Sequence, residues 1–250
     1  MRIAKKIAES GAASRREAER LIAEGRVYVN GDIVTTPVFF VDDSHEITID
    51  EKPIGKKSER LIVWKMNKPK GYLTTKRDPK ERKTVFDLFP KTDDRLLYIG
   101  RLDYNSEGLL LFTNDGNFSR KLELPATGLS RSYKVRFHGN LTQEKIEKLQ
   151  NGVTVDGINY GPIDAKIIKQ DKSNNWAILT LKEGKNREIR KVLESLGCIV
   201  NRLIRISYGT VSLGNLPLGK VEKLSENEVQ KLIKTANRSA SNKTSDSTKV

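Results

Sequence analysis

The first fifty residues place their apolar positions at helical intervals. Four apolar residues recur at spacings of three and four near the start of the chain: Ile3, Ala4, Ile7 and Ala8. This spacing is typical of a helix with one buried face, and Gly11 suits the left-handed turn that ends such a helix. Ser14 and Glu17 have the form of a capping box, which predicts a second helix that ends near Gly25. We therefore expect two short helices in succession.

An alternating apolar pattern follows these helices. Residues 27–34 alternate around Asn30-Gly31, a pair that readily takes the positive φ angles of a type I′ turn, so they predict a hairpin. Residues 47–49 would add a further strand. We expect a compact helix-helix-hairpin domain at residues 1–52. Residues 53–60 carry too little apolar surface to pack and are interpreted as a linker.

From residue 61 onward the pattern changes to short apolar runs. Residues 62–66 and 72–75 are expected to form two strands joined by a turn at residues 68–71. The unbroken apolar run at residues 109–112 ends at Asn114-Asp115-Gly116, which favours a fully buried strand over a helix. Further strands are expected at residues 133–137, 153–160, 165–168, 176–181 and 199–206. Most of this region is therefore predicted to be sheet.

Three helical segments interrupt these strands. Caps or apolar stripes predict helices at residues 142–150, 187–196 and 226–234. The predicted class is α+β, with the small N-terminal domain followed by a domain at residues 61–234 that has a mixed or antiparallel sheet. Residues 235–250 are mostly Ser, Asn, Thr and Lys, and are expected to form a disordered basic tail because their apolar content cannot offset the entropy of ordering.

Charge narrows the classes of partner. The chain has 46 Lys plus Arg against 32 Asp plus Glu, a formal net charge of +14, which attracts polyanions. Nucleic acid is the leading partner and an anionic membrane surface is the rival, but no stretch approaches the roughly 18 to 20 apolar residues of a spanning helix. No secretory signal is evident at the start. A single cysteine cannot form an intramolecular disulfide, and together with two histidines it supplies few zinc ligands, so we expect a reducing, cytoplasmic setting and no structural metal.

The densest chemical signal is a polar loop bounded by glycines at residues 100–108. It leads directly onto the buried run at residues 109–112, and a loop fixed to a rigid strand can hold a reactive group accurately. Asp103 is the candidate, because a carboxylate serves as nucleophile or base without a metal. The alternative is that Asp103 only caps a turn. Glu107 is a competing carboxylate, which we interpret as a solvated loop charge.

A second polar cluster lies at residues 182–191, where a strand ends and a helix begins. Such a helix start offers free N–H groups and cations to a phosphate, although an ordinary amphipathic helix with solvated cations fits the pattern as well. Arg187 and Arg190 lie at helical spacing, and the periodicity does not say which points inward. Tyr133 opens a strand, where its ring could pack in the core or stack on an unpaired base. The sequence alone favours the core.

Taken together, these segments resemble one branch of the bacterial ribosomal pseudouridine synthases, which comprises type A for the small ribosomal subunit and types B, E and F for the large one. Residues 14–18 and 25–31 resemble the pattern of the S4 RNA-binding domain. Residues 100–116, with Gly100-Arg101-Leu102-Asp103 at their start, match the family's catalytic motif almost throughout. Residues 67–71 and 183–190 resemble two further family motifs. Residues 77–87 and 202–209 look most like type B.

The resemblance implies a cofactor-free isomerase acting on ribosomal RNA, with 23S RNA or an assembly intermediate of the large subunit as the expected substrate. It places the catalytic aspartate at Asp103, the active-site tyrosine at Tyr133 and the basic partner of the aspartate at Arg190. The target uridine would flip out of the stack, and Asp103 would attack C1′ or remove the C2′ proton. Tyr133 would stack on the uracil and assist removal of the C5 proton. We expect a monomer.

Positive side chains are the candidates for holding the RNA backbone. Those expected to bind RNA are Arg15, Arg16, Arg20, Arg26, Lys68, Lys70, Arg101, Lys185 and Arg187, together with the amide of Asn186. The arginines of the N-terminal domain supply charge without an evident set of base-reading groups, so phosphate contacts should dominate there. The alternative function is a non-catalytic RNA-binding factor in ribosome assembly.

Overall fold

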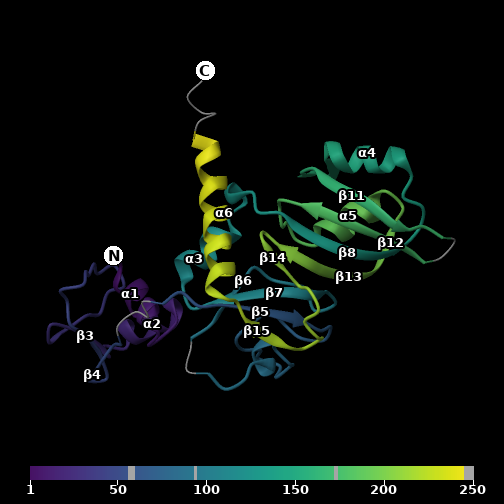
Figure 1. Cartoon of the computed structure of the whole chain (residues 1–250). Helices are drawn as coiled ribbons and strands as arrows, with labels where there is room; N and C mark the ends of the chain where they lie inside the picture. Colours follow the sequence, from purple (N-terminus) through teal and green to yellow (C-terminus); the bar gives the residue numbers. More distant parts are fainter. Residues whose placement is uncertain (56–59, 93–94, 172–173, 245–250) are drawn as a thin grey trace. The chain divides into compact units, whose positions relative to one another are not determined.

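The chain divides into two units, each with its own sheet and apolar core. The computed structural model describes residues 1–55, 60–92, 95–171 and 174–244 (Figure 1). The first unit contains residues 1–61 with residues 114–116, and the second contains the remainder of the described chain. Among the described residues, no helix has the length and apolar character that crossing a membrane requires.

The first unit is the predicted helix-helix-hairpin. Its elements are α1 (Ile3–Ser10), α2 (Arg15–Ala23), β1 (Val27–Val29), β2 (Asp32–Ile33), β3 (Ile47–Ile49) and β4 (Lys52–Pro53), and its sheet has the order β2-β1-β3-β4. The Ser14 hydroxyl accepts a hydrogen bond from the Glu17 N–H at 3.1 Å, which confirms the expected cap. Asn30 and Gly31 take φ angles of 52° and 90°, as a type I′ turn requires. β4 extends the unit into the segment expected to be linker, and residues 56–59 of that segment lie outside the described residues.

A mixed sheet forms the second unit, as predicted. Its main strands are β5 (Val63–Lys68), β7 (Glu107–Thr113), β8 (Arg131–His138), β11 (Ile163–Lys169), β12 (Asn175–Leu181), β13 (Ile199–Tyr208) and β15 (Val221–Lys223), in the order β11-β12-β8-β13-β7-β5-β15. The shorter strands are β6 (Leu97–Ile99) beside β7, β14 (Val211–Ser212) beside β13, and the separate hairpin of β9 (Val153–Val155) and β10 (Ile158–Tyr160). The main strands pair in antiparallel fashion except β13 and β7, which are parallel.

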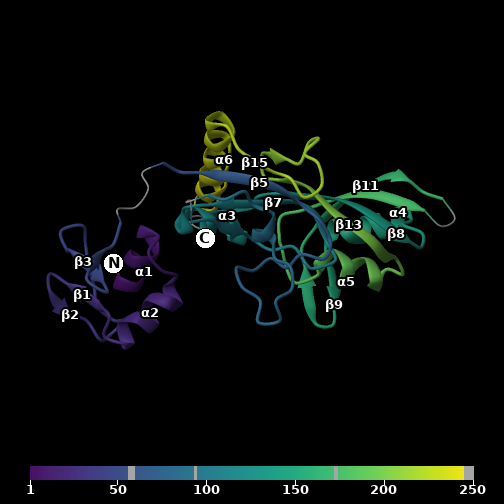
Figure 2. The same ribbon diagram turned by 90° about the horizontal axis from the view of Figure 1, so that it is seen from below.

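Helices cover this sheet in the second unit. They are α3 (Gly116–Glu123), α4 (Gln143–Asn151), α5 (Glu188–Ser195) and α6 (Glu226–Thr244), with short 3₁₀ turns η1 (Val85–Leu88) and η2 (Pro125–Thr127). α4 and α5 bury their apolar stripes in the same core cluster as Val135 and Phe137 of β8, so both helices lie on one face of the sheet (Figure 2). Tyr133 lies in the same alternating phase of β8 and therefore faces that side too.

Strand β7 is where the sheet divides. One edge of β7 pairs with β5 along its whole length, from Val63 opposite Thr113 to Lys68 opposite Gly108. The other edge takes β13 only at its start, where Gly108 lies opposite Arg205, and takes β6 at its end. Because β6 and β13 share one edge of β7, the chain between β6 and β7 emerges at the fork between them. This chain is the loop that carries Asp103.

Three expectations from the sequence are corrected. Residues 72–75 do not form a returning strand, since only an isolated bridge joins Leu73 to Thr84. The helix expected to end at residue 234 continues to Thr244, because Val229, Leu232 and Ala236 are all buried and extend one apolar stripe. The predicted disorder is therefore wrong for residues 235–244, and residues 245–250 lie outside the described residues. α3 and β6 were not predicted.

The close approach of β7 and β13 predicts a strict need for glycine at position 108. Its φ is +98°, and an added Cβ would lie 2.3 Å from the Arg205 carbonyl oxygen and 2.7 Å from its backbone nitrogen. Gly108→Ala should lower the free energy of unfolding by about 3 kcal/mol or more, because backbone cannot move aside as a flexible side chain does. Urea unfolding followed by the emission of Trp64 and Trp176 measures this, since both tryptophans lie in the second unit.

Gly214→Ala is the matched control. Gly214 also has a positive φ, of +55°, but an added Cβ would meet no atom within 4 Å. It should cost only the backbone penalty of roughly 1 to 2 kcal/mol. Equal losses in the two variants would show that the contact between the strands is not what requires glycine at position 108.

Candidate active site

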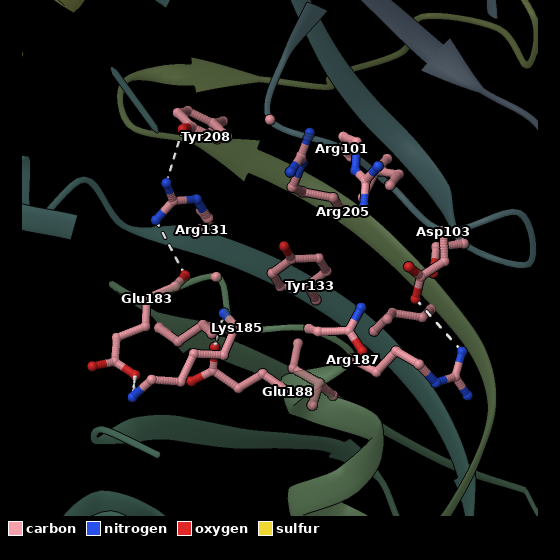
Figure 3. A pocket seen from close by; sticks show the side chains of 18 of the residues that line it. Arg101, Asp103, Arg131, Tyr133, Glu183, Lys185, Arg187, Glu188, Arg205 and Tyr208 are labelled. Carbon is pink, nitrogen blue, oxygen red and sulfur yellow. Dashed lines mark hydrogen bonds and ion pairs between the residues drawn. The ribbon is translucent and has the colours of Figure 1, made fainter. Parts of the chain in front are cut away.

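A cavity of about 600 Å³ opens beside the fork in the sheet. Its wall combines the loop at residues 100–106, the starts of β8 and α5, the turn at residues 183–187 and the last part of β13 (Figure 3). This size is within the usual range for small-molecule pockets. Every part of the wall belongs to the second unit, so the cavity is formed within one folded body.

Two buried polar side chains hold the Asp103 loop through hydrogen bonds to its backbone. Lys68 is fully buried at the end of β5, and its Nζ donates to the carbonyl oxygens of Pro69, Asp103 and Ser106 at 3.0, 3.1 and 3.0 Å. The Thr74 hydroxyl donates to the Leu102 carbonyl oxygen at 2.8 Å. The loop is therefore held through its backbone on both sides of Asp103, which leaves the carboxylate free to face the cavity.

The burial of Lys68 corrects its expected role. We predicted that Lys68 binds RNA, but its side chain has no exposed surface. Burial lowers the pKa of Lys68 to about 8, and the nearby Asp103 and Glu107 carboxylates oppose that shift. Lys70 is exposed beside it, so of the two lysines of this motif only Lys70 is available to a phosphate.

Asp103 pairs with the residue at the start of α5. The Asp103 carboxylate lies 3.6 Å from Nη1 of Arg187, with 39% of the Asp103 side chain exposed (Figure 3). Arg187 has a φ of 52°, which is uncommon for an arginine, and the Glu188 carboxylate accepts from the Lys185 N–H in the same turn. Local backbone strain of this kind collects at functional sites.

Arg190 does not make the direct pair with Asp103 that we expected. It lies further along α5, and its guanidinium donates to the Val200 carbonyl oxygen at 2.9 Å and to the Asn105 carbonyl oxygen at 3.3 Å. Burial lowers the pKa of Arg190, and Arg187 adds to this while Asp103 opposes it. Arg190 thus supports the Asp103 loop and acts on the carboxylate from a distance, whereas Arg187 makes the direct ion pair.

Tyr133 belongs both to the core and to the cavity wall. It is only 9% exposed and packs in the core cluster, yet it also lines the cavity. Its strand neighbours in the sheet are Leu179 and Arg205. The ring is therefore packed in the core, as the sequence favoured, and it also borders the cavity, whereas its stacking on an unpaired base stays a prediction.

Glu107 is a second correction. It is 5% exposed rather than solvated, and Arg202 donates to both of its carboxylate oxygens at 2.8 and 3.0 Å. Such a bidentate pair is stronger than most surface ion pairs. Glu107 begins β7 and Arg202 lies in β13, so this pair closes the same strand junction that Gly108 permits and leaves Asp103 as the carboxylate of the loop that faces the cavity.

The other side chains that were predicted to contact RNA differ in their exposure and in their ion pairs within the protein. Arg15 and Arg16 are exposed, as are Arg101, Asn186 and Arg187 beside the cavity. Arg20 is held by the carboxylates of Glu17 and Glu24, and Arg26 by those of Asp50 and Glu24. Lys185 pairs with Glu183 at 2.7 Å, which raises the pKa of Lys185. Of the four predicted arginines in the first unit, Arg15 and Arg16 are therefore the two with no ion pair to a carboxylate among the described residues.

Two buried arginines of the cavity wall were not among the predicted site residues, although the basic segment at residues 202–205 had been considered as a groove lining. Arg131 is 7% exposed and Arg205 is 2% exposed. Each occupies the core-facing phase of its strand, Arg131 in line with Tyr133 and Val135, and Arg205 in line with Leu203. The sequence offered one signal: each arginine stands at a position where the alternation of its strand places apolar, inward-facing residues.

Comparisons with known proteins agree with this geometry. Residues 62–195 match the family model for RNA pseudouridylate synthase, and residues 1–47 match the model for the S4 domain. The chain belongs to the RNA pseudouridine synthase family. This confirms the resemblance drawn from the motifs at residues 14–31 and 100–116, and it makes the protein an isomerase with an S4 domain at its N-terminal end.

Individual relatives extend the match over nearly the whole chain. An RNA pseudouridine synthase of Rickettsia typhi is 41% identical over 93% of this chain and 95% of its own length. A ribosomal large subunit pseudouridine synthase B of Bacillus subtilis is 37% identical over 92% of this chain and 95% of its own. A crystal structure of a pseudouridylate synthase matches with a TM-score of 0.66 and 26% identity over 93% of this chain and 99% of its own.

The hydrogen bonds of Lys68 to the Asp103 loop predict that Lys68 positions this loop for catalysis. Lys68→Met should lower the single-turnover rate of pseudouridine formation by roughly tenfold or more, because the carbonyl groups of Asp103 and Ser106 lose a charge-assisted hydrogen bond. RNA affinity should change little. Rapid-mixing kinetics and RNA titration measure the two effects separately.

Lys70→Met is the control for Lys68→Met, and it should weaken RNA binding without loss of stability.

The folded-state pKa of Lys68, about 8, is below the ordinary value for lysine, so the unfolded chain binds more protons between about pH 8 and about pH 10. The contribution of Lys68 to the free energy of unfolding should therefore rise with pH over that window, so the free energy of unfolding of the parental protein should increase relative to that of Lys68→Met. A loss of RNA affinity in Lys68→Met equal to that in Lys70→Met would contradict the assigned role.

Proposed function

We propose that this protein isomerises a uridine of large-subunit ribosomal RNA to pseudouridine, with Asp103 as the catalytic carboxylate. One observation carries the assignment: Asp103 faces the cavity of a pseudouridine synthase fold, paired with Arg187 at 3.6 Å and sharing the cavity wall with Tyr133. The choice of large-subunit RNA rests on the name of the relative from Bacillus subtilis, which aligns over 92% of this chain.

The reaction requires the nucleotide to leave its helix. The N1–C1′ bond must break, uracil must turn, and C5 must bond to C1′ with loss of the C5 proton. These atoms are inaccessible in a stacked base, so the uridine flips into the cavity at a cost of a few kcal/mol. Tyr133 presents a ring on which the uracil can stack, and the basic side chains at the rim hold the neighbouring phosphates.

Two routes remain open for Asp103. Its carboxylate either attacks C1′ and displaces uracil, or removes the C2′ proton so that uracil leaves as the C1′–C2′ double bond forms. Arg187 balances the negative charge of the carboxylate in both routes. Arg190 keeps the loop in place through the Asn105 carbonyl. Tyr133 is the candidate for assisting the final removal of the C5 proton. No step of either route needs a cofactor.

The S4 unit contributes affinity in this proposal. Arg15 and Arg16 lie exposed at the start of α2, where they can meet phosphates of the RNA. The protein would act as a cytoplasmic monomer on ribosomal RNA or on an assembly intermediate of the large subunit.

Incubation with unmodified ribosomal RNA tests the function. The purified protein should form pseudouridine in large-subunit RNA and leave small-subunit RNA unmodified, as mapped by chemical reactivity. Tight binding without any modified position would favour the alternative, a non-catalytic assembly factor.

Replacing the catalytic carboxylate tests its role directly. Asp103→Asn should abolish pseudouridine formation, because the amide is neither a base nor an effective nucleophile. The Kd for RNA should stay within about threefold, a change of less than 1 kcal/mol. Glu123→Gln is the matched control: Glu123 is an exposed carboxylate that also lines the cavity, and glutamine keeps the oxygen that accepts from the Gly100 N–H at 2.7 Å, so activity should be retained. An Asp103→Asn protein that works at the parental rate would refute the assignment.

Removing the exposed arginines tests the role of the S4 unit. The double variant Arg15→Gln with Arg16→Gln should flatten the dependence of log Kd on log salt by about 0.7 to 0.9 for each phosphate that is no longer bound. The single-turnover rate at saturating protein should not change. The control is Lys166→Gln with Lys223→Gln, which removes two exposed charges from the second unit. An identical salt slope in both double variants would show that only net charge matters.

A further inference from the structure

Arg205 is a buried cation, and one of its N–H donor groups makes no hydrogen bond with the described residues. Its side chain is 2% exposed in β13, and its Nε donates to the Leu109 carbonyl oxygen at 2.6 Å. Its Nη2 has no hydrogen-bond partner among the described residues, although it is buried. A buried charged group is normally paired, because loss of its hydration is costly. Arg202, three positions earlier, shows the usual solution in its bidentate pair with Glu107.

A second buried cation, Arg131, lies against the same tyrosine ring as Arg205. The guanidinium of Arg205 lies 5.1 Å from the ring centre of Tyr208, and that of Arg131 lies 4.7 Å from the same ring. Arg131 uses its donors on the carbonyl oxygens of Leu129, Lys182 and Glu183 and on the Tyr208 hydroxyl. Arg131 is therefore satisfied by the protein, and Arg205 is the buried cation in this wall with an unused donor (Figure 3).

The sheet register sets Arg205 beside the tyrosine of the cavity. Tyr133 and Arg205 are direct partners on β8 and β13, so their side chains leave the same face of the sheet about 5 Å apart at their origins. Both line the cavity that Asp103 faces. A flat ring stacked on Tyr133 would bring its edge toward Arg205, and the edge of uracil carries two carbonyl oxygens.

We propose that Arg205 donates a hydrogen bond to a carbonyl oxygen of the flipped uracil and stabilises the negative charge that this ring acquires during the reaction. The inference rests on the proposed function and adds a residue to it. When the N1–C1′ bond breaks, its electron pair stays with uracil and spreads over N1, O2 and O4. When C5 bonds to C1′, the ring supplies the pair, and the C5 proton then leaves. Arg205 remains protonated throughout and takes no part in bond exchange.

The burial of Arg205 makes such a donor effective, because little water competes for it. A preorganised donor aimed at a developing oxyanion is worth roughly 10²-fold to 10³-fold in rate. The interaction also favours uracil over cytosine at O4, because cytosine has an amino group there, which would face the guanidinium donor to donor. Arg205 would therefore act in both rate and choice of base.

The test combines a protein variant with altered uridines. Arg205→Met removes the donor and keeps a long apolar side chain, and Arg136→Met is the control, because Arg136 is exposed on the opposite face of β8. RNA fragments contain the target uridine, 2-thiouridine or 4-thiouridine at that site, since sulfur accepts hydrogen bonds more weakly than oxygen. Single-turnover rates and Kd are measured for each combination, after tryptophan emission has established that each variant is folded.

Arg205→Met should slow the reaction of uridine by roughly 10²-fold, with RNA affinity and the Arg136→Met rate unchanged within about threefold. The parental protein should lose roughly tenfold on one of the two thio substrates, and this loss should shrink to within about twofold in Arg205→Met. If Arg205→Met does not fold, the same comparison is made with Arg205→Lys, which keeps the charge and can still donate hydrogen bonds but lacks the planar fork of the guanidinium, and it should show a smaller, roughly tenfold loss.

Three results would overturn the inference. One is a variant rate within about threefold of the parental rate. Another is a thio penalty that is absent from the parental protein or fully retained in the variant. The last is a rise in Kd without a change in rate, which would assign the Arg205 donor to an RNA phosphate. A parental protein that forms no pseudouridine at all would instead refute the proposed function.

Discussion

The parallel contact between β7 and β13 is the constraint on which the site depends. It joins the two halves of the mixed sheet over only two residue pairs, one of which sets Gly108 against Arg205. The backbones approach so closely there that a Cβ at position 108 would lie 2.3 Å from a carbonyl oxygen. The bidentate pair of Glu107 with Arg202 closes the same junction. The fork that this junction leaves in the sheet is where the Asp103 loop emerges and the cavity opens.

Buried cations then turn the fork into a site with fixed geometry. Lys68 holds the carbonyl groups of Asp103 and Ser106, and Arg190 holds that of Asn105. These contacts involve backbone, so they order the loop without using the carboxylate itself. Arg187 supplies the ion pair to Asp103 at 3.6 Å. The family motifs therefore contain residues that position the loop, such as Lys68 and Arg190, as well as residues that face the cavity.

Local patterns predicted the fold better than they predicted the site. The capped helix after Ser14 and the hairpin at Asn30 follow from hydrogen bonds between near neighbours in sequence, and both were correct. The roles of Lys68 and Glu107 were misjudged because their partners lie 35 to 95 residues away. Arg205 was absent from the predicted site residues for the same reason. From sequence alone, a charged residue is expected to be exposed unless the carbonyl oxygen or carboxylate that it pairs with is known. Only the folded sheet shows which groups pair.

A structure of the Asp103→Asn protein bound to RNA that contains the target uridine tests the central claim most directly. The account predicts that the uridine has left its helix and that its base occupies the cavity against Tyr133, with C1′ about 3 to 3.5 Å from the side chain at position 103. A bound RNA whose target base stays stacked while the cavity remains empty, or whose ribose cannot approach position 103, would contradict it.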